Sequence, residues 1–418
     1  MKKALGVLLL CCLLFSQAHA LTLPPDAKIY TNPNYPMMVN TLTPLPDGAF
    51  VLAGCIRHPG EYRDMPENIS YEDKEEEILI DAAAVCLNPD GTKRWSLRLA
   101  DPQAENWFAC QGQMPDGRLL LTFRTADSNS FGSQHFIVGL DGIVEEMLPV
   151  RKLAEIVPPR SIQLMPSGYF CDGSLPVDDV FGEDYPRTIV MLDFDFNEMW
   201  RMDHQWAYYN GIERPDGYFY LGGTIGSEGA WYGYDDLALS VCKIDRNGDK
   251  VWEFTEAPLP CFSFAWPLLF PPDGGVAFVG NYTPERTPQS VNPNEPQPQT
   301  LTKLDENGNH LWSRAYDGLW FGNAAVLGDG YVLCGQISTD AMDHDYILLH
   351  VDANGEVLGT LPIAGDDTLV PGAPSFITDE EGNVYVYASL AEPDDRINRR
   401  SGEVKSFFYA KIDENSFQ

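Results

Sequence analysis

The sequence has few basic residues, and beyond its first segment it has no apolar run of the length that a membrane-spanning helix needs. Its 418 residues include 28 Lys and Arg against 61 Asp and Glu, which gives a formal net charge of −33. A surface of this sign repels the phosphates of nucleic acids and of anionic lipids. We therefore expect no nucleic acid partner and no insertion into a membrane.

The common catalytic signatures are also missing. The sequence contains no G-x-S-x-G nucleophile turn, no G-x-x-x-x-G-K-[ST] phosphate loop and no H-E-x-x-H zinc motif. The histidines after residue 20 are scattered, without the close spacing of a metal-binding pair, at His58, His135, His204, His310, His344 and His350. The sequence therefore identifies no catalytic residue, no metal ligand and no cofactor.

Cysteine pairs are not evident either. Seven cysteines follow residue 20, and no two of them form a C-x-x-C motif: Cys55, Cys86, Cys110, Cys171, Cys242, Cys261 and Cys334. Most lie within apolar runs such as LSVCKID and YVLCGQI, where cysteine acts as a small buried hydrophobic residue. An odd number in a chain of this length does not resemble a disulfide scaffold. We expect mostly free thiols.

Residues 1–20 have the three parts of a secretory signal peptide. Lys2 and Lys3 are basic, Ala4 to Phe15 form an apolar run, and Ala18-His19-Ala20 is a small-x-small cleavage site. Cleavage there leaves residues 21–418 as one domain and removes two lysines, so the formal charge of −33 becomes −35. We expect a secreted chain, extracellular or, where the host has an outer membrane, periplasmic.

Two turn signals alternate along the whole of the remaining chain. The first is a tight turn followed by an apolar run, and its seven glycines are Gly48, Gly117, Gly168, Gly217, Gly274, Gly330 and Gly382. The second begins about 20 to 40 residues after each of these, as CLNPDGTKRW, VGLDGIVEEM, MLDFDFNEMW, KIDRNGDKVW, KLDENGNHLW, HVDANGEVLG and KIDENSFQ. Seven units of about 50 to 60 residues result.

Each unit therefore contains two hairpin turns between runs of β-branched and aromatic residues, and no long helical periodicity. Four short strands in strict succession are typical of a propeller blade, here lettered A to D from the axis to the rim. The sequence predicts an all-β fold, a seven-bladed β-propeller of four-stranded antiparallel blades. The first turn joins A to B, and the second joins C to D.

The two ends of the chain predict how the ring closes. The last unit ends at Gln418, directly after its C-to-D turn, and therefore lacks a strand D. The segment AKIYTN (Ala27 to Asn32) precedes the first strand A, where the other units have a strand D. We expect it to pair with the last strand C, SFFYAKI (Ser406 to Ile412).

The D-x-N-G turns share oxygen-bearing residues with calcium loops, so a metal site is the alternative interpretation. However, the full D-x-[DN]-x-[DN]-G-x₅-E pattern is absent, and no single turn supplies the six to eight oxygens that calcium prefers. We interpret these segments as structural turns. The tryptophans that follow them, Trp95, Trp200, Trp252 and Trp312, are then expected to pack between neighbouring blades.

The units resemble the repeats of secreted bacterial β-propeller proteins, a non-enzymatic branch of the quinoprotein-like superfamily, over roughly residues 27 to 418. The shared feature is the KLDENGNHLW type of C-to-D hairpin. Quinoprotein dehydrogenases typically have eight blades and a T-G-K-x-x-W motif, which only DGTKRW approaches here. The sialidase Asp-box has an Asp-to-Gly spacing one residue shorter. The resemblance therefore implies an architecture, and no active-site residue is carried over.

The B-to-C and D-to-A connections are long and lie on the face opposite the tight turns, where a rigid scaffold usually presents its binding loops. Ten residues before each turn glycine, strand A leaves this face at Met38, Trp107, Pro158, Ala207, Phe264, Trp320 and Gly372. We predict a ligand-binding aromatic group there: Trp107, Trp206, Phe264, Trp266 and Trp320. The alternative is that these rings fill the channel or pack between blades.

Two functions follow from this arrangement, and a third possibility is a purely structural surface protein, which a plugged channel mouth would favour. The first is a monomeric, non-catalytic binding protein for a glycan or an extracellular protein, held on the long-loop face. The alternative is a secreted polysaccharide hydrolase or lyase with carboxylates in the same axial funnel. Carboxylates with shifted pKa values at the channel mouth would favour the enzyme, and an aromatic platform would favour the binding protein. We regard the enzyme as the less favoured of the two.

Overall fold

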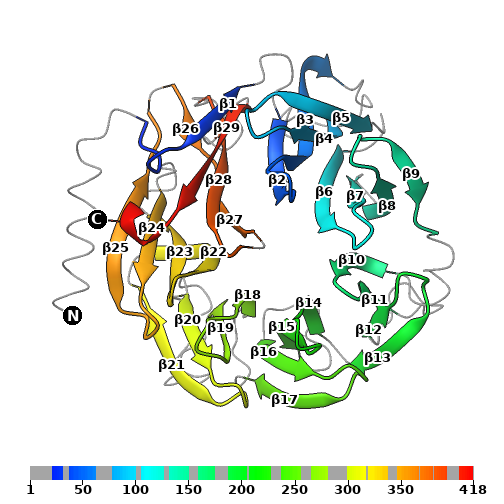
Figure 1. Ribbon diagram of the computed structural model, residues 1–418, viewed down its shortest axis with the longest axis vertical. Coiled ribbons are helices and arrows are strands. Elements are labelled where there is room, and N and C mark those ends of the chain that lie inside the picture. The colour runs from blue at the N-terminus through cyan, green and yellow to red at the C-terminus, as the bar shows by residue number, and fades with distance from the viewer. Residues whose placement is uncertain are drawn as a thin grey trace, which may run out of the picture.

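The computed structural model describes sixteen segments, residues 21–31, 37–62, 78–99, 105–126, 131–149, 159–174, 187–204, 207–226, 237–255, 265–280, 299–316, 319–337, 346–366, 368–379, 381–392 and 404–417. Nearly all of them are strands or the tight turns between strands, which form seven antiparallel sheets around a common axis (Figure 1). The chain is a seven-bladed β-propeller. No helix in these segments is long and apolar enough to span a membrane.

Six blades each contain four consecutive strands, ordered A to D from the axis outwards. Blade 1 contains β2 (Met37–Pro44), β3 (Phe50–Tyr62), β4 (Ile78–Leu87) and β5 (Lys93–Leu99). Blade 2 contains β6 (Glu105–Gln113), β7 (Leu119–Ala126), β8 (Phe131–Val138) and β9 (Val144–Met147). Blade 3 contains β10 (Pro159–Met165), β11 (Gly168–Ser174), β12 (Arg187–Leu192) and β13 (Glu198–His204). Blade 4 contains β14 (Ala207–Glu213), β15 (Phe219–Gly226), β16 (Leu237–Ile244) and β17 (Lys250–Thr255). Blade 5 contains β18 (Ala265–Leu269), β19 (Val276–Gly280), β20 (Thr300–Leu304) and β21 (His310–Ala315). Blade 6 contains β22 (Leu319–Leu327), β23 (Gly330–Ile337), β24 (Tyr346–Val351) and β25 (Val357–Ile363).

Blade 7 joins the two ends of the chain, as the sequence predicts. Its strands are β26 (Val370–Pro371) with β27 (Ser375–Thr378), then β28 (Val384–Ala391), β29 (Val404–Ile412) and, outermost, β1 (Lys28–Thr31). β1 pairs antiparallel with β29 from Lys28 opposite Tyr409 to Thr31 opposite Ser406. The ring is therefore closed by main-chain hydrogen bonds between the two ends of the chain (Figure 1).

The D-x-N-G segments are turns whose aspartate organises the main chain. In the blade 5 turn, one carboxylate oxygen of Asp305 accepts hydrogen bonds from the N–H groups of Asn307 and Asn309, at 2.9 and 2.8 Å. Gly308 has a φ of +81°, a conformation that glycine adopts without strain. The carboxylate is thus occupied by its own turn, which confirms the interpretation as a structural turn.

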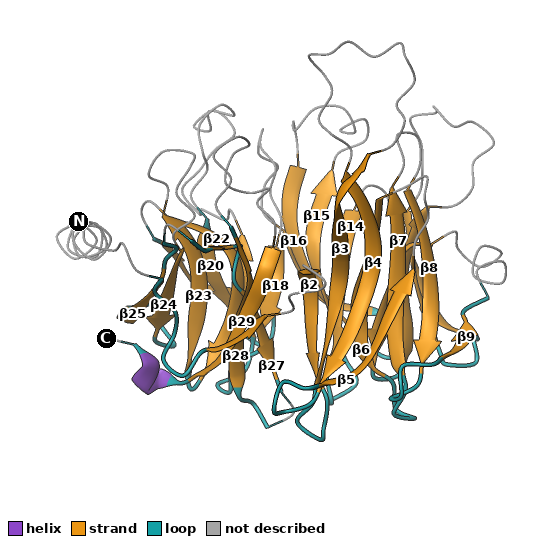
Figure 2. Ribbon diagram, turned by 90° about the horizontal axis from the view of Figure 1, so that it is seen from above, coloured by secondary structure: helices purple, strands orange, loops and turns teal. Residues whose placement is uncertain are grey.

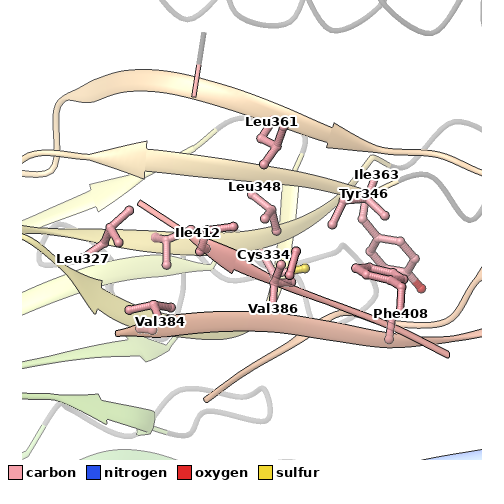
Figure 3. Packing of buried hydrophobic residues seen from close by; sticks show 14 of the residues in the cluster. Leu327, Cys334, Tyr346, Leu348, Leu361, Ile363, Val384, Val386, Phe408 and Ile412 are labelled. Atoms are coloured by element: carbon pink, nitrogen blue, oxygen red, sulfur yellow. The ribbon is translucent and has the colours of Figure 1, made fainter. Parts of the chain in front are cut away.

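The hydrophobic core lies between the blades rather than within them. The buried side chains form seven clusters, and each contains residues of two adjacent blades. The cluster between blades 6 and 7 is an example, with Leu348 and Ile363 facing Val386 and Phe408 (Figure 3). Because every blade depends on both neighbours for its core, the closed ring is the smallest unit in which all seven clusters are complete.

An aromatic ring connects the outer strand of each of four blades to the next blade. Trp95, Trp200, Trp252 and Trp312 lie over the C-to-D turn glycines of the following blades, which are Gly142, Gly248, Gly308 and Gly355. A Cβ atom added to Gly142 would lie 2.7 Å from the Trp95 ring, so only glycine fits under it. The Trp95 indole also donates a 2.9 Å hydrogen bond to the carbonyl of Leu140. Packing of these tryptophans between blades is confirmed.

Tyr30 takes the same role where the ring closes. Its ring stacks on Phe407 and Tyr409, with centroid distances of 5.1 and 5.6 Å, and meets the edge of Phe50 in blade 1. A Cβ atom on Gly91, the C-to-D turn glycine of blade 1, would collide with it. The N-terminal strand therefore supplies both the hydrogen bonds and the aromatic contact of the last blade.

At the two remaining junctions the large ring is at the turn of the following blade and not on the outer strand. Blade 2 has Glu146 at the position of the tryptophan, and the next turn has Phe196 where five of the seven turns have glycine. Phe196 has a φ of +63°, and its ring stacks on Tyr169 at 5.2 Å within the cluster between blades 2 and 3. Blade 6 has Gly359 at the tryptophan position, and Phe417 of the C-terminal turn packs against the cluster between blades 6 and 7. A turn with a large ring thus faces each strand that lacks one.

We predict that the tryptophan contact dominates the local stability of a junction. Trp95→Ala should lower the free energy of unfolding by about 3–5 kcal/mol, because it removes a buried ring over a glycine that cannot fill the space. Ser96→Ala, at the next and exposed position of β5, should change it by less than about 0.5 kcal/mol. Urea unfolding of both variants measures the difference, and equal effects would contradict this role of the ring.

The closing strand gives a second prediction. Deletion of residues 21–31 removes β1 and Tyr30, and exposes the edge of β29 together with the cluster between blades 7 and 1. The truncated chain should have a lower melting temperature than the chain that begins at Leu21, and it should aggregate on heating. Thermal unfolding followed by light scattering checks this, and equal melting curves would contradict closure by β1.

Candidate functional site

The innermost strands of the blades surround the axis of the ring. They are β2, β6, β10, β14, β18, β22 and, in blade 7, β26 with β27 (Figure 1). The tight A-to-B and C-to-D turns gather at one end of the blades (Figure 2). The B-to-C and D-to-A connections therefore belong to the opposite end, where the sequence predicts the ligand-binding aromatic group. The prediction that all of these connections are long is wrong for three of them, because only a few residues separate β7 from β8, β13 from β14 and β21 from β22.

Two of the five predicted site residues have described side chains. Trp107 is half-buried in β6, between Asn106 and Phe108, which are both fully buried. Trp266 is half-buried in β18 and packs against the cluster between blades 4 and 5. Trp107 thus presents part of its ring to solvent from a rigid strand, whereas Trp266 has part of its ring in the core.

The side chains of the other three residues are not among those described. Trp206 and Phe264 lie outside the described residues, directly before β14 and β18. Trp320 lies in β22 with its main chain opposite Gln336, but its side chain is not among those described. Convergence of the five aromatic residues on one platform therefore stays a prediction.

Most of the inner strands are irregular, whereas counting ten residues back from each turn glycine assumes that all of them are regular. Five of them contain a β-bulge, with one extra residue opposite strand B, and the bulge follows Val39, Cys110, Pro159, Ala265 or Phe321. β14 has none. Because a bulge reverses which side chains face each neighbour, residues ten positions before the glycine need not point the same way.

Side chains near the bulges connect the inner strands by hydrogen bonds. The Thr41 hydroxyl of blade 1 accepts a 2.8 Å bond from the N–H of Cys110, and the Gln163 carbonyl of blade 3 accepts one of 3.2 Å from Gly211. The Asn323 amide of blade 6 donates to Ser375 of blade 7, at 3.2 Å. In each case a polar side chain reaches the next blade, where it satisfies a group near the unpaired edge of strand A.

The hydrogen-bonding role of such polar residues was not predicted, although the sequence contains a pattern that indicates it. The position seven residues before each turn glycine is occupied by Thr41, Cys110, Ser161, Asn210, Pro267, Asn323 and Ser375. Five of these seven are Ser, Thr or Asn. Small polar residues at a fixed repeat position on a strand indicate recurrent hydrogen bonding, and the structure shows it between blades.

Every described carboxyl whose pKa is clearly shifted has a pKa below its ordinary value. Hydrogen bonds from turn N–H groups and hydroxyls lower the pKa of the shifted carboxyls, as at Asp90, where Thr92 donates both kinds.

Burial raises the pKa of the thiols, to about 11 for Cys86 and about 12 for Cys171. Six cysteines are free and buried, which confirms the expectation for them, while Cys261 lies outside the described residues. Within those residues no group of His, Cys, Asp and Glu is arranged to hold a metal ion.

His135 is the buried titratable group with the largest described shift among the histidines. Its ring lies in β8 of blade 2 and is only 1% exposed, and one ring nitrogen is 3.0 Å from the hydroxyl of Thr122. Burial, helped by the charge of Arg124, lowers its pKa to about 4. The folded protein therefore holds this imidazole neutral.

This burial predicts a loss of stability in mild acid. In the unfolded chain the imidazole takes up a proton below about pH 6.5, whereas in the folded chain it does so only near pH 4. The stability from neutral His135 is complete above pH 6.5 and should fall by about 3 kcal/mol as the pH drops to 4. Urea unfolding at several pH values should show a flatter profile for His135→Asn. The half-exposed His310→Asn should leave the profile steep, and identical profiles for all three proteins would contradict this.

A cavity of about 600 Å³ lies where the two ends of the chain meet, lined by Pro25, Asp26, Lys28, Tyr385, Tyr409, Ala410, Lys411, Asp413, Asn415 and Ser416. Lys28 donates a 3.3 Å hydrogen bond to the hydroxyl of Tyr409. The lining contains two lysines and two aspartates, so it has no net charge of its own. This cavity is distinct from the predicted aromatic group at the axis.

Comparison with known proteins identifies no family and no activity for this chain. No protein-family model matches the sequence, and no curated protein matches it. A protein of unknown function from Dyadobacter fermentans is similar in structure, with a TM-score of 0.46 at 10% identity over 93% of this chain and 98% of that one. A catalytically inactive virginiamycin B lyase from Staphylococcus aureus, solved with quinupristin, has a TM-score of 0.47 at 13% identity over 93% and 99% of the two chains.

A third similar structure is prolyl oligopeptidase B from Galerina marginata, with a TM-score of 0.48 at 12% identity. The alignment covers 91% of this chain but only 51% of the peptidase chain. At such low identities a structural similarity concerns the architecture of the chain and does not extend to its chemistry. The similar proteins include enzymes, and their activities are not transferred to this chain.

Proposed function

We propose that the protein is a secreted, non-catalytic binding protein that holds a glycan or an extracellular protein on the face opposite its tight turns. The observation that carries the proposal is the setting of Trp107. Trp107 is half-buried on an inner strand, so it is partly accessible, while the adjacent Asn106 and Phe108 are fully buried and fix the main chain. A rigid aromatic ring presented to solvent binds sugar faces and apolar side chains at a low entropic cost.

The scaffold supports this role because it holds its inner strands firmly. Phe108 belongs to the cluster between blades 1 and 2, and the N–H of Cys110 is bonded to Thr41 of the neighbouring blade. β6 is thus attached to blade 1 at Phe108 and Cys110, directly after Trp107. Binding residues on such a scaffold keep their geometry in the absence of ligand, which lowers the cost of association.

The proposal predicts that Trp107 contributes to binding rather than to folding. Trp107→Ala should remove binding to the ligand found in a glycan array or among extracellular proteins, a loss of about 1–3 kcal/mol or more per anchor. The melting temperature should stay close to that of the unchanged protein. Trp200→Ala is the matched control, because Trp200 is only 4% exposed between blades 3 and 4. That variant should lose about 3–5 kcal/mol of stability.

The same pair of measurements applied to Trp320→Ala tests whether the aromatic group extends to blade 6. Binding lost in both variants, with folding retained, would support one platform across the axis. Severe destabilisation of Trp107→Ala would show that the ring is part of the core and would remove the basis of the proposal. Turnover of a polysaccharide by the purified protein would favour the hydrolase or lyase alternative.

A further inference from the structure

The first residues after the predicted cleavage site are ordered parts of the propeller. Leu21, Leu23 and Ala27 pack against the cluster between blades 6 and 7, and Pro24 is buried. Thr22 exchanges two main-chain hydrogen bonds with Ala364, at 2.9 and 3.0 Å, directly after the outer strand of blade 6. The segment thus runs from blade 6 to β1, the outer strand of blade 7.

The main-chain nitrogen of Leu21 lies beside a carboxylate group. It lies 3.3 Å from one carboxylate oxygen of Asp366, in the turn that follows β25. The other oxygen of Asp366 accepts hydrogen bonds from the N–H groups of Thr368 and Leu369 and from the Thr368 hydroxyl, each 2.7 Å long. The turn therefore fixes the carboxylate and leaves one oxygen directed at residue 21.

This arrangement coincides with the processing site that the sequence predicts. Ala18-His19-Ala20 is the small-x-small motif, and cleavage after Ala20 turns the amide nitrogen of Leu21 into an α-ammonium group. A neutral N–H gives Asp366 one hydrogen bond, whereas an ammonium group gives it a full opposite charge and three donors. Only the processed chain can form this ion pair.

We propose that Asp366 is a docking site for the mature N-terminus, and that removal of residues 1–20 creates an ion pair between the Leu21 α-ammonium group and the Asp366 carboxylate that fastens the closing segment to blade 6. The ion pair secures the outer end of the segment, and β1 secures the other end by pairing with β29. Export and closure of the ring are thereby coupled, because the contact is complete only after cleavage.

Few other charges lie near this pair. The strand beside the segment, β25, contains no ionisable side chain. Hydrogen bonds from Thr368, Leu369 and Leu21 lower the pKa of Asp366 against the opposing effect of burial, so the carboxylate is charged at neutral pH. The other charged residues on the segment, on β29 and in the adjoining turns are Asp26, Lys28, Lys405, Lys411, Asp413, Glu414 and Asp367. The side chain of Lys405 and the whole of Asp367 lie outside the described residues.

The first experiment exports the full chain from a bacterial host and determines the mature N-terminus by mass spectrometry. We expect Leu21 as the first residue. The pKa of its α-amino group is then measured from the pH dependence of acetylation. It should lie about 1 unit above the ordinary range of about 7.7–8.0, so that acetylation at pH 8 is about fourfold slower than for a free terminus.

Asp366→Asn is the decisive variant, because an amide keeps the oxygen that accepts from Thr368 and Leu369 but loses the charge. It should return the α-amino pKa to its ordinary range. Asp352→Asn is the matched control, since Asp352 forms the same kind of turn in the same blade, with bonds of 2.8 Å from Asn354 and Glu356. It should leave the raised pKa unchanged.

Stability provides an independent readout. The ion pair raises the pKa of the ammonium group in the folded state, so its contribution is complete below about pH 7.7 and is lost as the pH rises through the folded pKa. The melting temperature of the processed chain should therefore exceed that of Asp366→Asn at pH 7, and the difference should vanish near pH 10. A chain that retains Ala20, prepared from a cleavable fusion, provides the same comparison if Asp366→Asn fails to fold. Its melting temperature at pH 7 should also be lower than that of the processed chain.

Four results would overturn the proposal. One is a mature chain that begins at a residue other than Leu21. Two others are an α-amino pKa in the ordinary range in the processed protein and the same raised value in Asp366→Asn. The last is an equal loss of the raised pKa in Asp352→Asn, which would indicate a general effect of net charge instead of a specific pair.

Discussion

The structure depends on contact between neighbouring blades, in which a large aromatic ring on one blade meets a turn on the next. Each blade alone exposes two apolar faces, and the seven clusters of buried residues all lie between blades. The ring over a turn glycine sets the spacing at the rim, as Trp252 does over Gly308. Polar side chains such as Thr41 and Asn323 join the blades near the axis.

Closure is the condition that this dependence imposes. In an open array the first and last blades would each leave one apolar face without a partner. Here β1 completes blade 7, and Tyr30 supplies the aromatic contact over Gly91 that tryptophans supply elsewhere. The proposed ion pair between Leu21 and Asp366 would secure the same segment at blade 6, so that residues 21–31 would hold the ring closed by three kinds of interaction.

The same rigidity makes the inner strands suitable for presenting a ligand site. Trp107 is held between buried neighbours while part of its own ring remains accessible. The described carboxylates with shifted pKa values serve turns, where they accept main-chain hydrogen bonds, and Asp305 and Asp90 are examples. Acidic residues thus act here as turn-forming groups, and aromatic residues divide between structure and the candidate surface.

The site was only partly predictable from the sequence, and the inner strands show why. Counting back from the turn glycines correctly places Trp107 and Trp320 on strands A. The count cannot include the bulges after Val39, Cys110 or Phe321, because a bulge is set by how two strands and a neighbouring blade fit together. For the same reason the side chain of Trp266 could be assigned to the core between blades 4 and 5 only from the structure.

The sequence by itself determined the architecture, because turn chemistry and strand periodicity are local and recur in every unit. Gly308 with Asp305 makes one turn, and repetition of such turns gives the number of blades, their strand order and the strand that closes the ring. Only the tertiary structure decided which residues meet across a junction, since Phe196 can replace a tryptophan over a glycine only when both blades are in place. It also brought Leu21 to Asp366, a contact between residues 345 positions apart, which no local pattern encodes.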